Sequence, residues 1–157
     1  MAKIRTLEKK VPVEIANLGI SPELFANIVQ NNAESVLYQL LGLNLREVGL
    51  GVARLDLKVQ QQHINFWQII HGGVISVLVD AAMGAAVRSF GIQGVTIDLI
   101  THYLAPARPG DQVMAEGRVV FKGGKVLIAE ADVWQNEEKL IAKARATFFN
   151  KGPLLRT

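Results

Sequence analysis

Apolar residues change their spacing along the chain, and each change marks a predicted element of secondary structure. From Ser21 to Gly42 they recur at helical spacing, behind an N-cap serine and a proline at the first helical position, so we predict one amphipathic helix. Residues 52–59 alternate between apolar and polar, which is typical of a half-buried strand. Residues 60–71 follow neither period, and we predict a long loop of the kind that often carries function.

The most apolar stretch comes next and indicates a helix over residues 72–90, with apolar residues nearly all round its circumference. A helix without a polar face is predicted to be buried on all sides. After Gly91 the sequence returns to alternation, and Gly123-Gly124 between two such runs is a good hairpin signal. The alternating runs predict four strands, at residues 95–104, 112–121, 125–135 and 139–149.

The order of these elements predicts an α+β fold in which an antiparallel sheet wraps one long, buried central helix, with an extra helix near the N-terminus. In the last two strands the residues on one side are mostly small, which leaves room on the sheet for something bulky. Residues 1–20 are expected to form a leader, and residues 21–157 a single domain. Because an open antiparallel sheet has unpaired edges, we expect a homodimer.

Composition narrows the classes of function. Half of the 157 residues are hydrophobic and only 20% are charged, which favours burial of part of the surface against another subunit. The net charge of +3 (17 − 14) suits an anionic small molecule but is no signature of nucleic-acid binding. The absence of cysteine excludes disulfides, a cysteine nucleophile and thiolate metal sites. No targeting segment or membrane span is expected, and a cytoplasmic location is the default.

Two features of the predicted central helix point to chemistry. His71, Gly72 and Gly73 stand at its start, where backbone N–H groups lack helical partners and the helix dipole is positive. Glycines let another group approach the backbone closely, so this is a candidate oxyanion site. Asp80 lies more than two turns into the helix, on the same face as Ser76. A carboxylate there is costly unless it is hydrogen-bonded or faces a cavity.

The spacing of these residues is similar to that of a known family. Asn65, the His-Gly-Gly triplet at 71–73 and Asp80 resemble the hotdog-fold acyl-CoA thioesterases of the phenylacetate-pathway type. Residues 95–111 resemble the third strand of that family and its exit turn. The resemblance covers roughly residues 40–149 and implies the hotdog fold.

The resemblance also implies a role for each matched residue. The amide of Gly72 polarises the thioester carbonyl, and Asp80, contributed by the other subunit, is the nucleophile or the general base. Asn65 and His71 orient the thioester and the loop, and Thr96 on the following strand helps to hold the attacking water. Family members are homodimers, commonly paired into tetramers, and they hydrolyse acyl-CoA without a metal or another cofactor.

Two departures from the family pattern concern the loop. The family often has proline directly after the asparagine and glycine three residues before the histidine, where this chain has Phe66 and Gln68. The loop is therefore expected to be shaped differently. On the following strand, Asp98 and His102 alternate in step with Thr96, and the sequence leaves open which of the three faces the site.

Basic residues around the predicted hairpin are candidates for substrate contacts. Lys122 and Lys125 flank Gly123-Gly124, and with Arg108 they suit the phosphates of CoA. Ordinary solvated hairpin charge is the alternative interpretation. Gly73, next to the proposed oxyanion donor, is a further candidate for substrate contact.

Two rival functions follow from the same residues. A hotdog hydratase or dehydratase would pair a loop histidine with an acidic helix residue, and an acyl-CoA-binding protein would bind without turnover. The three histidines have no metal-ligand spacing, so no metal site is predicted. Val74, Leu78 and Phe66-Trp67 suggest an apolar or aromatic pocket for the acyl group, whose identity the sequence does not reveal.

Overall fold

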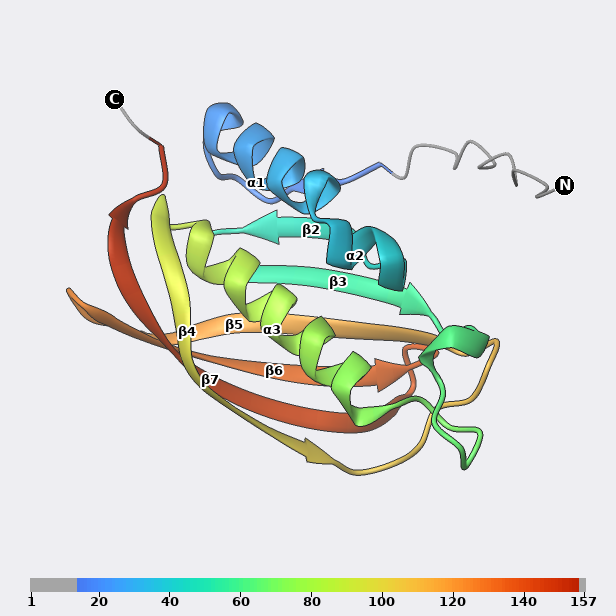
Figure 1. Ribbon diagram of the computed structural model, residues 1–157. Helices are drawn as coiled ribbons and strands as arrows, with labels where there is room; N and C mark the ends of the chain where they lie inside the picture. Colours follow the sequence, from blue (N-terminus) through green and yellow to red (C-terminus); the bar gives the residue numbers. More distant parts are fainter. Residues whose placement is uncertain (1–13, 156–157) are drawn as a thin grey trace, which may run out of the picture.

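The computed structural model describes residues 14–155, which form a seven-stranded sheet curled around one long helix (Figure 1). The strand order is β1-β2-β3-β5-β6-β7-β4, and neighbours are antiparallel except for β1 with β2. This arrangement confirms the predicted α+β fold. The elements are β1 (Ala16–Asn17), α1 (Pro22–Glu34), α2 (Val36–Leu41), β2 (Asn44–Gly49), β3 (Val52–Lys58), the 3-10 turn η1 (Gln61–His63), α3 (Gly72–Arg88), β4 (Ile92–Tyr103), β5 (Gln112–Lys122), β6 (Val126–Gln135) and β7 (Lys139–Pro153).

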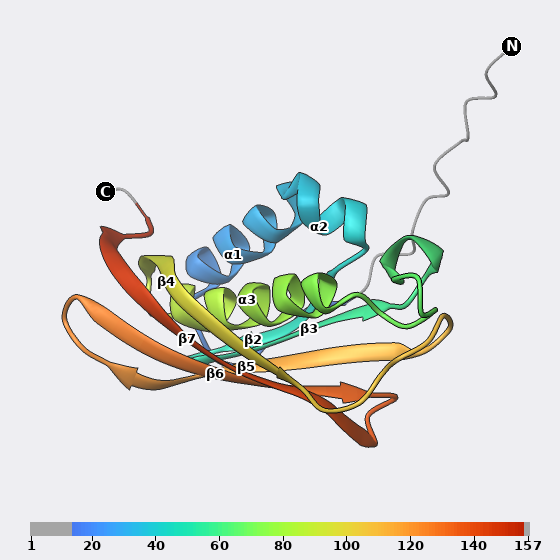
Figure 2. The ribbon, with the colours of Figure 1, turned by 60° about the horizontal axis from the view of Figure 1, so that its bottom comes forward.

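The central helix α3 lies on the concave side of the sheet, and α1 and α2 lie on the other side of α3 (Figure 2). Small residues permit this close approach. A Cβ atom on Gly117 of β5 would lie 2.5 Å from main-chain atoms of Ala82 and Met83. The small residues predicted on the inward side of β6 and β7 are buried, and they make room for α3 itself. They include Ala129, Ala131, Ala144 and Ala146.

The predicted single helix over residues 21–41 is wrong in one respect, because the structure divides it into α1 and α2. Ser35 lies between them with an extended backbone (φ −67°, ψ 110°), and its side chain accepts a hydrogen bond from the Tyr38 N–H. Serine competes for backbone groups in this way and favours helix starts over helix interiors. The predicted end at Gly42 is confirmed, with φ of 63° in the left-handed region.

Two strands were not predicted. β2 has an interrupted alternation, since a bulge shifts its register between Leu45 and Glu47 and places the buried Leu45 and Val48 three residues apart. A bulge of this kind hides a strand from a search for period two. β1 lies within the predicted leader and pairs with β2 through only two residues. Residues 1–13 of that leader lie outside the described part of the chain.

The prediction that the central helix is buried on all sides also needs correction. One face of α3, made by Ser76, Asp80, Gly84 and Arg88, is only partly covered within the chain. Most of the remaining residues from Ile75 to Val87 are buried, as the apolar sequence predicts, whereas the first turn, Gly72 to Val74, is exposed or only partly covered. No helix in the part of the chain that the structure describes is long and apolar enough to cross a membrane.

Candidate active site

The loop before α3 is anchored on a buried histidine. His63 is 1% exposed, its Nδ1 accepts a hydrogen bond from the Gln60 N–H, and its carbonyl accepts from the His71 N–H at 2.8 Å. Ile64 and Ile70 form a bridge that closes the loop. Burial lowers the pKa of His63, so the neutral form is favoured in the folded chain. His63 thus serves as a support for the site residues that follow it.

The tip of this loop is a tight turn built around Asn65. Its side-chain oxygen accepts a hydrogen bond from the Trp67 N–H at 3.0 Å, which leaves the side-chain NH₂ group to donate elsewhere. Phe66 and Trp67 are exposed and lie against each other with ring centroids 3.8 Å apart. Gln68 has φ of 62°, in the left-handed region that favours glycine. The chain therefore tolerates strain at the position where the family often has glycine.

His71 caps α3 with its side chain. Its Nδ1 accepts a hydrogen bond from the Gly73 N–H at 2.9 Å, so in the neutral ring the proton is on Nε2. Within residues 14–155 the Gly72 N–H has no acceptor. The start of α3 therefore presents a free amide next to the positive end of the helix dipole.

A pocket of about 380 Å³ opens at this end of the helix. It brings together two of the predicted site residues, Asn65 and Gly72. It also includes Tyr103, the last residue of β4, which the sequence analysis did not select. Its walls are mostly apolar. The lining residues are Asn65, Ile69, Ile70, Gly72, Ile75, Tyr103, Leu104, Ala105 and Pro106.

The suggested acyl-pocket residues do not line this pocket within one chain. Leu78 is fully buried in the core, so it has no surface for substrate. Val74 is only partly buried and packs against that core. Phe66 and Trp67 project from the loop, with 78% and 66% of their surfaces exposed.

Asp80 lies on the partly covered face of α3 and is held from the sheet. Thr96 of β4 donates its hydroxyl proton to Asp80 Oδ1 at 2.8 Å. The other predicted candidates on β4 face away from the helix. A bulge between Thr96 and Asp98 reverses the alternation, so Thr96 pairs with the inward Phe148 whereas His102 pairs with the outward Lys143. The bulge thus selects Thr96 and removes Asp98 and His102 from this side of the sheet.

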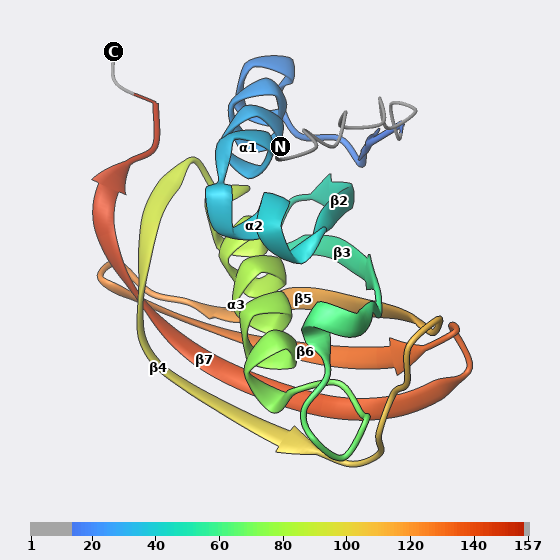
Figure 3. The same cartoon turned by 45° about the vertical axis from the view of Figure 1, so that its right-hand side comes forward.

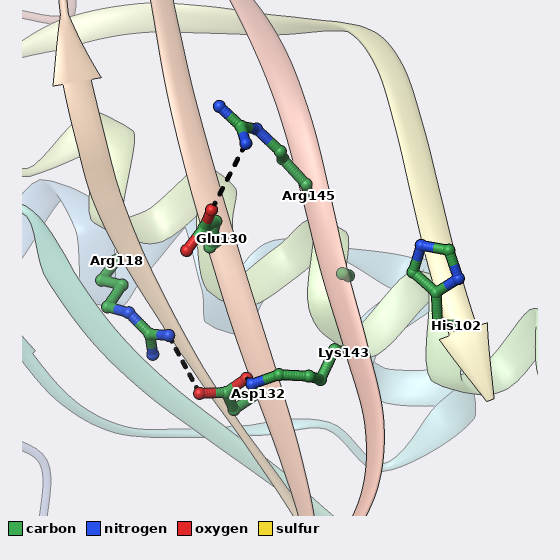
Figure 4. Close-up of a pocket in the computed structure, with 7 residues that line it drawn as sticks. His102, Arg118, Glu130, Asp132, Lys143 and Arg145 are labelled. Carbon is green, nitrogen blue, oxygen red and sulfur yellow. Dashed lines mark hydrogen bonds and ion pairs between the residues drawn. The ribbon is translucent and has the colours of Figure 1, made fainter. Parts of the chain in front are cut away.

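The outer face of the sheet carries a second pocket, of about 200 Å³, which is filled with ion pairs (Figure 4). Asp132 is 9% exposed and contacts both Arg118, at 2.9 Å, and Lys143. Burial alone would raise the pKa of Asp132, but the hydrogen bonds from Lys143 and Arg118 outweigh it and hold the pKa below its usual value. The charged residues here therefore satisfy one another. The pocket is lined by His102, Arg118, Glu130, Asp132, Lys143, Ala144 and Arg145.

The structure separates the two sets of predicted CoA-binding residues within one chain. The hairpin of Gly123 and Gly124, between β5 and β6, lies at the opposite end of the sheet from the start of α3 (Figure 1). Beside it, Lys122 Nζ lies 5.5 Å from the centroid of the Phe90 ring, just beyond the last turn of α3. Arg108 is at the same end as Gly72, in a turn where its N–H donates to Asp111 Oδ2 at 2.7 Å.

The two groups with predicted catalytic roles are also apart within one chain. Gly72 and Asp80 are separated by eight positions on α3 (80 − 72), which at 1.5 Å per residue amounts to about 12 Å. Figure 3 shows α3 as one uninterrupted helix between these positions. No single reacting carbonyl can contact both groups of the same chain. Within residues 14–155, no three potential ligand side chains gather to hold a metal ion.

Comparisons with known proteins show which family the chain belongs to. A family model described as the thioesterase superfamily matches residues 68–142. A putative esterase of Archaeoglobus fulgidus is 31% identical over 113 residues, which cover 72% of this chain and 73% of that protein. YigI, a medium/long-chain acyl-CoA thioesterase of Escherichia coli, is 30% identical over 126 residues, covering 69% of this chain and 81% of that protein.

Solved structures extend the likeness to most of the fold. The PaaI protein of the Escherichia coli phenylacetic acid degradation operon has a TM-score of 0.81 and covers 86% of this chain and 98% of its own, at 23% identity. A hypothetical thioesterase of Streptococcus pneumoniae, solved with coenzyme A, has a TM-score of 0.69 and 26% identity, covering 71% of this chain and 87% of its own. The chain therefore belongs to the thioesterase superfamily and is a thioester hydrolase with the hotdog fold.

Proposed function

We propose that the protein hydrolyses acyl-CoA thioesters to a free acid and CoA, at a site that two copies of the chain build together. The observation that carries this proposal is the free Gly72 N–H in a pocket beside Asn65, at the positive end of α3. An amide in that position suits the negative charge that develops on a thioester oxygen. The relative YigI, named for acyl-CoA substrates, and the streptococcal neighbour bound to coenzyme A support the choice of thioester.

Asp80 supplies the second half of the reaction, either as general base for water or as nucleophile. The Thr96 hydroxyl occupies Oδ1 of its carboxylate and leaves Oδ2 without a partner among residues 14–155. Such an oxygen is available to take a proton from water or to attack the carbonyl carbon. Thr96 thus orients the carboxylate and, as its neighbour, helps to hold the water. Asn65, through its NH₂ group, and His71, through Nε2–H, are the donors proposed to orient the thioester.

A homodimer resolves the distance of about 12 Å between the oxyanion donor and the carboxylate of one chain. β4 is an edge strand of the sheet, and it and the residue after it expose several large apolar side chains. A long apolar edge is a natural place for a second strand to pair. We infer that two copies join along β4, with Gly72 of one facing Asp80 of the other; pairing of dimers into tetramers stays a prediction. The exposed apolar residues are Val95, Ile97, Ile100, Tyr103 and Leu104.

The same dimer gives the predicted CoA-binding residues a common place. Two β4 strands that pair in antiparallel fashion bring the start of one strand to the end of the other. The hairpin with Lys122 and Lys125 lies near the start of β4, since Asn150 pairs with Gly94 and also bonds the Lys125 carbonyl. In the dimer it would therefore approach the end where the other chain has Gly72. We propose that Lys122, Gly123, Gly124, Lys125, Gly73 and Arg108 contact CoA there.

The proposal is tested by thiol release from short, long and aromatic acyl-CoAs, with hydration of enoyl-CoA measured in parallel. We expect thiol release and no hydration. Asp80→Asn should lower kcat by about 10²–10⁴, the usual contribution of general acid–base catalysis, and keep the fold. Asp98→Asn, on the outward side of β4, is the matched control and should retain wild-type kcat. Binding without turnover, hydration instead of hydrolysis, or an Asp80→Asn variant as fast as wild type would each contradict the proposal.

A further inference from the structure

Tyr103 packs directly on the glycine that carries the proposed oxyanion donor. If Gly72 had a Cβ atom, that atom would lie 3.0 Å from Cζ of the Tyr103 ring and 3.2 Å from its hydroxyl oxygen. A side chain at position 72 would therefore press on the ring and require it to shift by a few tenths of an ångström. Glycine at this position lets both the neighbouring ring and a substrate approach the backbone closely.

The hydroxyl group of Tyr103 makes two hydrogen bonds to the first turn of α3. It donates to the Gly72 carbonyl at 3.0 Å and lies 2.8 Å from Ser76 Oγ. A phenol has a single proton, which is used on the Gly72 carbonyl. Ser76 must therefore be the donor in the second bond. The hydrogen bonds thus run from the Ser76 hydroxyl to the Tyr103 hydroxyl, and from there to the Gly72 carbonyl.

This series of hydrogen bonds continues through the Gly72–Gly73 peptide group to His71. The carbonyl of Gly72 belongs to the same peptide group as the N–H of Gly73, which donates to His71 Nδ1 at 2.9 Å. A hydrogen bond to a peptide carbonyl strengthens the N–H of that peptide as a donor. Tyr103 thus acts on the peptide group from one side and His71 from the other.

Two glycines in succession form the most flexible start that a helix can have. An oxyanion donor must nevertheless hold a fixed direction before the substrate arrives, because reorientation during the reaction is costly. We propose that Tyr103 is the positioning residue that fixes the Gly72–Gly73 backbone, and with it the oxyanion donor and the His71 ring. The inference rests on the proposed function for its effect on turnover, but not for its effect on the backbone.

Tyr103→Phe tests the inference because it keeps the ring against Gly72 and removes only the hydroxyl. We expect kcat to fall about tenfold, the size that one hydrogen bond accounts for, with KM within twofold and little change in melting temperature. Thr101→Val is the matched control, since Thr101 lies on the same side of β4 and its hydroxyl is buried with no partner in residues 14–155. The control should retain wild-type kcat.

The bond from Ser76 provides a second test. Ser76→Ala should lower kcat less than Tyr103→Phe does, and the double variant should be no slower than Tyr103→Phe alone, because both changes interrupt one chain of bonds. A wild-type kcat in Tyr103→Phe, or losses that simply multiply in the double variant, would overturn the inference.

A measurement without substrate separates this inference from the proposed function. Hydrogen exchange of the Gly73 amide, followed by NMR, should be about tenfold faster in Tyr103→Phe than in wild type and unchanged in Thr101→Val. Equal exchange in all three proteins would overturn the positioning role, whatever the enzyme acts on. Absence of thiol release by the wild type, together with the expected exchange, would instead reject the proposed function and leave the backbone role standing.

Discussion

Polar groups on the outer face of the sheet and polar groups of α3 on its inner side differ in whether they have partners. On the outer face, Asp132 is matched by Arg118 and Lys143, and the charged residues that line the second pocket neutralise one another (Figure 4). On the inner face, the Gly72 N–H has no acceptor within residues 14–155, and Asp80 has only Thr96 as a hydrogen-bond partner there. The outer charged groups are satisfied by one another, whereas the Gly72 N–H and one oxygen of Asp80 keep free hydrogen-bonding capacity among residues 14–155.

Groups with partners and groups without them serve different purposes, stability and catalysis. Groups that satisfy one another raise the free energy of unfolding but have no capacity left for a substrate. Groups held in place without partners contribute less to stability, and they can interact with a charge that develops during a reaction. Changes on the outer face should therefore alter stability and spare turnover, and changes at the start of α3 should do the reverse.

Apart from the loss expected for Asp80→Asn, the largest effect is expected for removal of the free amide. Gly72→Pro deletes the N–H at the first helical position, where proline is well tolerated, and the extended His71 backbone (φ −67°, ψ 133°) suits a following proline. We expect kcat to fall by about 10²–10³. Gly72→Ala adds the same unfavourable contact with Tyr103 but keeps the N–H, so it is the control. Equal losses in the two variants would point to the contact, not the amide, as the cause.

A smaller effect, on stability alone, is expected on the outer face. Asp132→Ala should lower the free energy of unfolding by about 2 kcal/mol, because it removes a nearly buried carboxylate with two charged partners. Glu130→Ala, whose partner Arg145 is 3.6 Å away and mostly exposed, should cost less than about 0.5 kcal/mol. Urea unfolding measures both, and kcat should be unchanged in both.

The ionisation of Asp132 should make the stability of the folded chain depend on pH. The pKa of Asp132 is lower in the folded chain than in the unfolded chain. Its contribution to the free energy of unfolding is therefore fully present above the unfolded pKa, near 4, and is lost as the pH falls through the folded pKa. The difference between wild type and Asp132→Ala should therefore shrink in acid. A difference that stayed constant from neutral pH down to strongly acidic conditions would argue against ionisation as its origin.

The smallest effect is expected at Gln68 in the site loop. Its left-handed backbone (φ 62°) is unfavourable for a residue with a side chain, so Gln68→Gly should raise the free energy of unfolding by about 1 kcal/mol. Gln62→Gly, in η1 where φ is not positive, should lower it instead. Both are measured by urea unfolding, and a loss of stability in Gln68→Gly would mean that the side chain does more than tolerate this conformation.

Long elements with a sustained apolar period were predictable from the sequence, whereas short strands and the positions of bulges were not. The central helix and the four strands after it lie close to their predicted places, although register shifts interrupt the pairing of β4, β5 and β6. The bulges in β2 and β4 add one residue to a strand, which hides β2 and reverses the side on which His102 lies. Nothing in a local pattern of residues indicates such a bulge, because it is fixed by pairing with distant strands.

The candidate site shows the same limit. His71, Gly72 and Asp80 lie within one short segment, so their spacing alone pointed to the start of α3. Tyr103 meets Gly72 across 31 positions of sequence and was therefore missed as a site residue. The hydroxyl of a tyrosine at the end of a strand could have been singled out only by knowing that the strand ends against a helix start.

Subunit complementation tests the central claim, a site shared between two chains, most directly. Asp80→Asn and Gly72→Pro chains are unfolded together, refolded as a mixture and assayed for thiol release. About half of the dimers then contain one chain of each kind. In such a dimer one of the two sites combines an intact Gly72 with an intact Asp80, and the other site has both changes. The account therefore predicts recovery of about a quarter of wild-type activity. If each chain held a complete site of its own, no dimer would have an intact one, and a mixture as inactive as its two components would contradict the account.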